Sequence, residues 1–160
     1  MNLDDQLKSL SGYKDKNWGR LLHLLKKSFD EWASRELTRK GYTDFKMGYM
    51  PFIMNIGVEG ATNNELAQKA CITKQAMSKI VSELEELKFI TTKVNKNDRR
   101  STMIYLTNKG KHFVIEVINC VESLKKEYKK QLGEERFEAT FETIKEIIDY
   151  HKTIITPRES

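Results

Sequence analysis

The sequence predicts a mainly helical fold, in which a helix-turn-helix is followed by a β-hairpin and flanked by long helices. Three observations predict it. Only 8 glycines and 2 prolines stand in 160 residues, which is too few breakers for an all-β sandwich. Apolar residues recur every three or four positions near both ends of the chain. Two short β-prone runs stand between these helical stretches, separated by turn residues.

Helical periodicity begins at about residue 17 and continues to residue 40, with Gly41 placed where such a helix would stop. A shorter helix is expected at residues 45–56, and Pro51 inside it predicts a kink or a broken first turn. The apolar face of the first helix carries Trp18, Leu21, Leu22, Leu25, Phe29, Trp32, Ala33 and Leu37.

Two short helices follow. Thr62 and Glu65 have the spacing of a capping box, in which each side chain accepts a hydrogen bond from a free backbone N–H of the first turn. The helix they start is expected to end near Ala70, and Thr73 opens the next one, which runs to about Lys88. Two short helices separated by about three residues have helix-turn-helix spacing.

The pattern then changes to strands. Residues 89–94 and 101–106 are β-prone, and the polar residues 95–98 between them predict a hairpin with a basic tip. Thr107 is placed to cap a long helix that Gly133 interrupts, and a last helix is expected at residues 134–154. A helix-turn-helix followed directly by such a hairpin is a winged helix.

The net charge of +5 is concentrated in the middle of the chain. Residues 61–111 hold ten basic and five acidic side chains, so the net charge of this third alone equals the net charge of the whole chain. A focused positive field suits a polyanion such as nucleic acid, although a solvated lysine-rich surface has the same composition. No stretch approaches the roughly 18 apolar residues of a membrane span.

The two cysteines, Cys71 and Cys120, match neither a disulfide framework nor a zinc motif. We therefore expect a reducing, cytoplasmic location, and the acidic N-terminus lacks the apolar region of a signal peptide. Both thiols are candidate redox sensors, Cys71 first because it lies near the turn of the helix-turn-helix. The alternative for each is a buried thiol that acts as a small hydrophobe.

The second helix of the motif carries polar side chains away from its apolar stripe, as a helix that enters the major groove of DNA requires. The hairpin tip is basic, and a guanidinium inserted into a narrow minor groove is favoured by the negative potential there. The predicted DNA contacts are Thr73, Lys74, Gln75, Ser78 and Lys79 on the helix and Lys96, Arg99 and Arg100 on the wing.

Three segments resemble the MarR family of bacterial transcription regulators. They are Asn64-Glu65-Leu66-Ala67, the wing segment Asp98-Arg99-Arg100-Ser101, and Leu106-Thr107-Asn108-Lys109-Gly110. The similarity extends over about residues 45–112. It implies a homodimer that binds a palindromic DNA site, usually as a repressor, and that a small ligand or an oxidant releases from DNA.

The resemblance also implies a division of the chain. Residues 45–108 would form the winged-helix DNA-binding lobe, residues 1–44 and 109–156 the helical dimerisation region, and residues 157–160 a loose tail. Asp98 would orient the wing through an arginine, or serve only as a turn former. Lys88 departs from the family's usual glycine, which predicts that this helix end is strained or built differently. Glu83 replaces a residue that is often basic, which weakens phosphate attraction there.

In the family, a ligand pocket lies where the first, second and fifth helices meet. Aromatic and methionine side chains at this place would suit a phenolic or lipophilic effector, with ordinary core packing as the alternative. The candidate residues are Trp18, His23, Trp32, Tyr42, Met47, Met50, Met54 and His112. No cofactor and no metal are expected.

Catalysis is not expected, because the three histidines lack metal-ligand spacing and no nucleophile or phosphate-loop motif is present. The alternative to DNA binding is a winged helix that serves as a protein-interaction module, and Glu83 favours it. Salt dependence separates the two, because only binding to DNA releases counterions from phosphates.

Overall fold

The computed structural model describes residues 2–70, 73–95 and 101–155, apart from the side chains of residues 11, 14, 15, 70 and 74. Two compact units are distinguished, one formed by residues 1–113 and the other by residues 114–160. The elements are α1 (Leu3–Ser9), η1 (Ser11–Lys16), α2 (Trp18–Arg39), η2 (Met47–Tyr49), α3 (Met50–Ile53), β1 (Ala61–Thr62), α4 (Asn63–Ala70), α5 (Lys74–Glu86), β2 (Ile90–Val94), β3 (Thr102–Leu106), α6 (Asn108–Leu132) and α7 (Glu134–Ile155).

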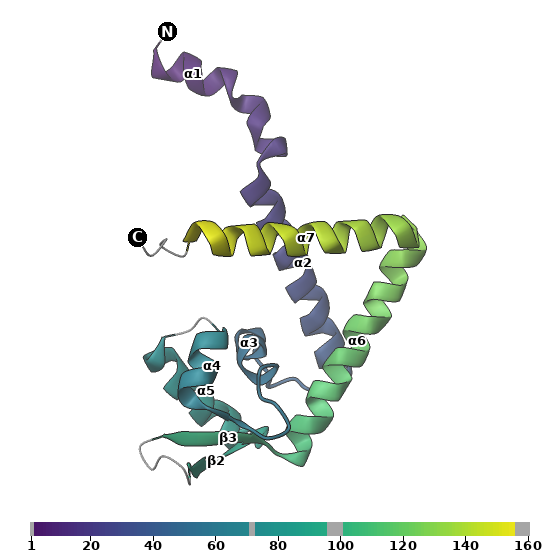
Figure 1. The fold of residues 1–160 in the computed structure, drawn as a ribbon. Coiled ribbons are helices and arrows are strands. Elements are labelled where there is room, and N and C mark those ends of the chain that lie inside the picture. Colours follow the sequence, from purple (N-terminus) through teal and green to yellow (C-terminus); the bar gives the residue numbers. More distant parts are fainter. Residues whose placement is uncertain (1, 71–72, 96–100, 156–160) are drawn as a thin grey trace. The chain divides into compact units, whose positions relative to one another are not determined.

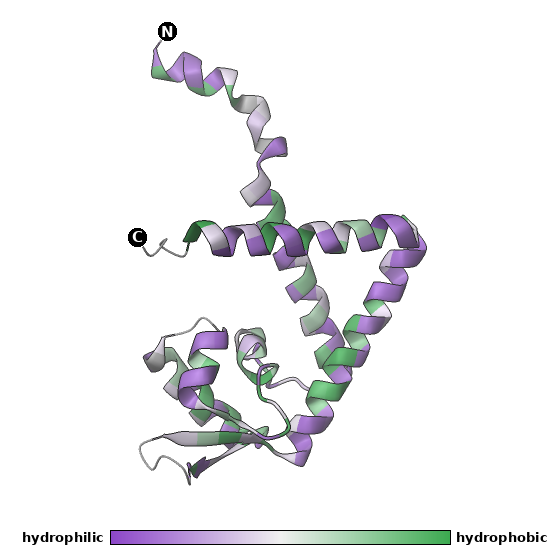
Figure 2. Ribbon diagram, viewed as in Figure 1, coloured by the Kyte–Doolittle hydropathy of each residue, from purple (hydrophilic) through white to green (hydrophobic). Residues whose placement is uncertain are grey.

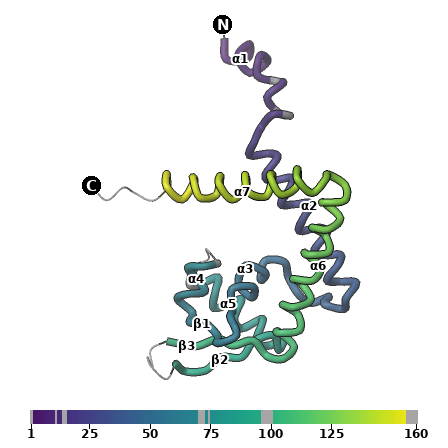
Figure 3. The backbone as a smooth tube through the Cα atoms, turned by 45° about the vertical axis from the view of Figure 1, so that its right-hand side comes forward, coloured from purple at the N-terminus to yellow at the C-terminus, as the bar shows by residue number. Residues whose placement is uncertain are grey.

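The mainly helical winged-helix fold is confirmed, since α4 and α5 are followed by the β2–β3 hairpin (Figure 1). The sheet has the order β1-β3-β2 and is antiparallel throughout. Ile90 lies opposite Leu106, and Val94 lies opposite Thr102. Helices α3, α4 and α5 gather beside this sheet in both backbone views (Figures 1 and 3).

The expected helix over residues 45–56 is wrong in length. The structure has the 3-10 helix η2 and the four-residue α3 in its place. Pro51 stands in the first turn of α3, where its missing N–H costs no hydrogen bond, so the helix begins at Met50 instead of running through the proline. Helix α1, η1 and the two-residue strand β1 were not anticipated from the sequence.

The core of the first unit joins the winged helix to the chain segments on both sides of it. Phe45, Phe89 and Phe113 contact one another, with ring centroids 4.3 to 5.5 Å apart. Tyr42 meets Phe113 edge-on at 4.8 Å. These rings and the other buried side chains hold the helix-turn-helix and the hairpin together; the most completely buried are Phe52, Ile53, Leu66, Leu84, Ile90, Ile104 and Phe113.

The second unit consists of the later part of α6 and of α7, which meet at Gly133 in the positive-φ conformation that glycine adopts most readily (φ 87°). Lys129 bridges the junction through ion pairs to Glu134 at 3.2 Å and Glu138 at 2.5 Å. No residue of α7 is buried, so apolar positions along this helix remain open to solvent (Figure 2).

Candidate nucleic-acid interface

Helix α4 begins with the predicted capping box. The Thr62 hydroxyl accepts a hydrogen bond from the Glu65 N–H at 3.3 Å, and Glu65 Oε2 accepts from the Thr62 N–H at 2.7 Å. The backbone hydrogen bond, reinforced by the Thr62 hydroxyl, lowers the pKa of Glu65. The Glu65 side chain is therefore ionised when it holds the first turn of α4.

Helix α5 presents a polar flank to solvent. Thr73 is its N-cap, and its hydroxyl accepts a hydrogen bond from the Ala76 N–H at 3.2 Å. Gln75, Ser78 and Lys79 are exposed, whereas Met77 and Leu84 are buried against the rest of the lobe. The polar and apolar faces therefore divide as the sequence indicated, and the polar one faces outward.

The end of α5 is closed by a residue in an unfavourable conformation. Lys88 has φ 61° and is the single non-glycine residue with positive φ in the described part of the chain. The Lys88 N–H donates to Glu85 O and the Phe89 N–H donates to Leu84 O, both at 2.9 Å, which is the Schellman pattern. The strain expected from a lysine at a glycine position is confirmed.

The same helix end is held from α6. The Lys109 ammonium donates a hydrogen bond to Leu87 O at 2.8 Å and lies 4.3 Å from the centroid of the Phe89 ring. The Thr107 hydroxyl donates to Lys88 O at 2.6 Å and accepts from the Gly110 N–H at 3.1 Å. The predicted cap of α6 is thus confirmed, and it also fastens the C-terminus of α5.

The Glu83 carboxylate forms ion pairs with two lysines. Its Oε2 lies 2.8 Å from the Lys46 ammonium, and its Oε1 lies 3.8 Å from that of Lys79. Lys46 precedes η2, 37 residues before Glu83 in the chain, and its ammonium also lies 5.4 Å from the Tyr49 ring centroid. A carboxylate in a surface expected to attract phosphate is therefore accompanied by an additional cation.

The β2–β3 hairpin leads to the tip of the wing. The Asn95 N–H donates to Ser101 O at 3.0 Å, and the Asn95 side chain donates to Ser101 Oγ at 2.9 Å, so the two strands are still joined at the base of the tip. The predicted wing residues Lys96, Asp98, Arg99 and Arg100 lie outside the described residues, as does Cys71. The side chain of Lys74 is not described either.

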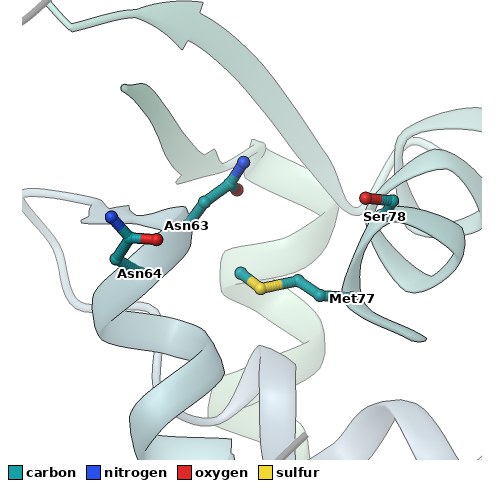
Figure 4. A pocket seen from close by; sticks show the side chains of 4 residues that line it. All are labelled: Asn63, Asn64, Met77 and Ser78. Carbon is teal, nitrogen blue, oxygen red and sulfur yellow. The ribbon is translucent and has the colours of Figure 1, made fainter. Parts of the chain in front are cut away.

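A small pocket of about 190 Å³ lies between α4 and α5 (Figure 4). Its described lining consists of Asn63, Asn64, Met77 and Ser78, so it adjoins the polar flank of α5. The buried Oδ1 of Asn63 accepts no hydrogen bond from the described residues.

The residues predicted to contact an effector do not line this pocket. Trp18 is 51% exposed, Met54 is 36% exposed, and His23 and His112 are also exposed. Trp32 is half-buried and lies 5.5 Å from Phe29 between ring centroids, while Tyr42, Met47 and Met50 are half-buried. None of these residues belongs to the described lining of the pocket in Figure 4.

Other residues of the site were missed from the sequence. Lys46 lies 37 residues before Glu83, and Glu85 contacts Thr92 seven residues later, beyond the end of α5, so no helical spacing marks either pair. Among the described residues, no group of three His, Cys, Asp or Glu side chains is placed to hold a metal ion. No helix in the described ranges combines the length and the apolar character needed to cross a membrane.

The winged-helix segment matches a known family model. Residues 58–102 match the model described as MarR family, and this range includes β1, α4, α5, β2 and the first residue of β3. No curated protein matches the sequence.

Solved structures match over most of the chain. The crystal structure of MarR has a TM-score of 0.70 at 18% identity and covers 86% of this chain and 98% of its own. The crystal structure of the S. aureus MepR–DNA complex has a TM-score of 0.69 at 20% identity, and the match covers 84% of this chain and 97% of the MepR chain. Streptococcus pneumoniae FabT in complex with DNA has a TM-score of 0.70 at 17% identity, covering 86% and 99%.

The TM-scores show a shared fold, and the family model matches the helix-turn-helix and the first strand of the hairpin. The winged-helix segment is therefore similar to the MarR family, and the chain shares its fold with solved structures that include MarR.

Proposed function

We propose that the protein is a homodimeric repressor that binds a pseudo-palindromic site in double-stranded DNA. The observation that carries the proposal is the outward polar flank of α5, which exposes Gln75, Ser78 and Lys79 while Met77 is buried. A helix of this kind fits the major groove, where amide side chains can bond adenine and lysines can reach guanine or phosphate. MepR and FabT have the same fold and are solved with DNA.

The wing would contact the adjacent minor groove through Arg99 and Arg100, with Lys96 near the phosphates and Asp98 orienting the tip. The hairpin that carries these residues leaves the lobe next to α5, because β2 follows α5 after the turn at Lys88. Arginines on such a hairpin favour narrow, strongly negative minor grooves.

A second copy of the chain is the proposed occupant of the apolar helix faces outside the lobe. Trp18, Leu21 and Leu25 on α2 are 50 to 57% exposed, and Phe141 and Ile148 on α7 are 43 and 51% exposed. Exposed apolar residues in such numbers indicate an association surface. Apolar positions recur along both helices in Figure 2. A two-fold dimer would place its two recognition helices in successive major grooves about 34 Å apart.

Release from DNA is proposed to follow a population shift. A small aromatic or lipophilic effector that prefers a dimer with another spacing of its recognition helices lowers DNA affinity by that preference. The candidate effector contacts are Trp18, His23, Trp32, Met47, Met50, Met54 and His112. Oxidation at Cys71 is a second proposed trigger, and Cys120, which is a free thiol in α6, is the control position.

The decisive experiment is an unbiased selection of duplexes by the purified protein, followed by affinity measurements over a range of salt concentrations. A pseudo-palindromic consensus and a linear fall of log affinity with log salt concentration are expected. Absence of binding to any duplex at low salt would favour the protein-interaction module instead.

Two variants refine this test. Gln75→Ala is expected to relax base preference more than total affinity, since it removes a contact to a base edge. Replacing Arg99 and Arg100 together by Ala is expected to weaken binding to all sequences. Arg136→Ala on α7 is the matched control for the loss of an exposed arginine. An unchanged consensus for the first variant, or unchanged affinity for the second, would remove that residue from the proposed interface.

A further inference from the structure

We infer that Lys46 is an additional DNA-phosphate contact, which Glu83 holds beside the recognition helix until phosphate replaces the carboxylate. The inference rests on the proposed DNA binding. It concerns a residue that lies before the helix-turn-helix in sequence and that no motif marks.

The position of Glu83 on α5 is the first step. Residues four apart lie above one another on a helix, so Gln75, Lys79 and Glu83 form one row along α5. The first two are exposed and belong to the proposed DNA contacts. Glu83 continues the row toward the C-terminal end of the helix, where its carboxylate would repel the DNA backbone.

Lys46 changes the charge at that end of the row. Its ammonium is 2.8 Å from Glu83 Oε2, while Lys79 is 3.8 Å from the other carboxylate oxygen. Two ammonium groups around one carboxylate leave one net positive charge, so this part of the row attracts phosphate despite the glutamate. The Tyr49 ring, with its centroid 5.4 Å from the same ammonium, supports Lys46 from its own segment.

Lys46 and Lys79 are exposed enough to contact a ligand. The side chains of Lys46 and Lys79 are 65% and 78% exposed, whereas that of Glu83 is 25% exposed. Ion pairs between exposed groups contribute little to stability, so both lysines can exchange Glu83 for a phosphate at small cost. The geometry thus makes Glu83 a positioning residue in the free protein and a competitor of phosphate in the complex.

The test measures affinity for a selected duplex and for a random duplex as a function of salt concentration. Lys46→Met, which keeps the aliphatic stem, is expected to reduce the salt slope by about one for each protomer bound and to weaken both duplexes equally. Lys26→Met is the matched control, because Lys26 is also an exposed lysine paired with a carboxylate, that of Asp30, on α2. The Lys26→Met variant is expected to have the same DNA affinity and the same salt slope as the unmodified protein.

Glu83→Gln is the second arm. It removes the competing charge while retaining a side chain of the same size, so it is expected to raise affinity several-fold at low salt and to steepen the salt slope. Circular dichroism melts verify that each variant folds.

The possible failures are distinguishable. If the unmodified protein binds no duplex at low salt, the proposed function itself fails. If the unmodified protein binds DNA but Lys46→Met shows the same slope and affinity, DNA binding stands and the role of Lys46 is refuted. An unchanged affinity of Glu83→Gln likewise shows that no phosphate competes for this carboxylate and overturns the inference.

Discussion

Glu85 on α5 holds β2, the outer strand of the hairpin, through hydrogen bonds to Thr92. Its Oε1 accepts hydrogen bonds from the Thr92 backbone N–H and from the Thr92 hydroxyl, each 2.9 Å long. Strand β2 is the last strand in the order β1-β3-β2, so this N–H points away from the sheet and has no strand partner on that side. The Glu85 carboxylate therefore provides a hydrogen-bond acceptor for a backbone N–H of the edge strand, and it links α5 to the wing.

Replacing Glu85 by Ala removes both hydrogen bonds. We expect a loss of about 1 kcal/mol in the free energy of unfolding, because the bonds are charge-assisted but lie near the surface. DNA affinity should fall for all sequences, since the wing is no longer fixed to α5. Thermal melts and gel-shift titrations measure the two effects. Glu86→Ala, at an exposed neighbouring position of α5, is the control, and an equal loss in both variants would contradict the role of Glu85.

Lys88→Gly is expected to stabilise the protein by about 0.5–1 kcal/mol. Lys88 has φ 61°, where a Cβ atom is strained, and a glycine relieves this strain while keeping the two hydrogen bonds of the Schellman motif. The increase in Tm is measured by calorimetry or circular dichroism. Lys88→Ala retains a Cβ atom and serves as the control. If alanine stabilises as much as glycine, backbone strain at this position is not the cause.

Gly110→Ala is expected to destabilise the fold by about 3 kcal/mol or more. A Cβ atom at this position would lie 2.0 Å from the Phe89 carbonyl oxygen and 3.2 Å from a Leu106 methyl carbon, so α6 could not approach the end of α5 as it does. Gly48→Ala is the control, because nothing lies within 4 Å of a Cβ atom there. Urea denaturation of both variants measures the difference, and equal midpoints would show that α6 adjusts freely.

The capping box at α4 is expected to weaken in acid. The hydrogen bond from the Thr62 backbone N–H holds the pKa of Glu65 below its ordinary value of 4.5. Glu65 therefore contributes stability that is fully present above the unfolded-state pKa and is lost as the pH falls through the lower folded-state pKa. The stability difference from Glu65→Gln, which does not titrate here, should be constant near neutral pH and shrink below pH 4.5.

The check is an NMR titration of the Glu65 carboxyl carbon in the folded protein, combined with urea melts of both proteins at several pH values. Thr62→Val removes the hydroxyl donor and should bring the midpoint partly back toward the ordinary value. A titration midpoint at or above 4.5 in the unmodified protein would contradict the argument.

The helix-turn-helix, the hairpin and the long flanking helices could all be predicted from the sequence, because each depends on neighbouring residues. Periodicity defined α2, α6 and α7, the spacing of Thr62 and Glu65 defined the start of α4, and β-prone runs defined β2 and β3. The expectation of an unusual helix end at Lys88 came from the resemblance to the MarR family, which usually has glycine at this position.

Contacts between side chains that are distant in sequence could not be predicted and are visible in the folded chain. Lys46 reaches Glu83 across 37 residues, and Lys109 reaches Leu87 O across 22 residues. Strand β1 is only two residues long and exists because Ala61 and Thr62 pair with β3, so its own sequence carries too little pattern to reveal it. Such contacts are set by the packing of the whole lobe around Phe45, Phe89 and Phe113, which no periodicity within one segment encodes.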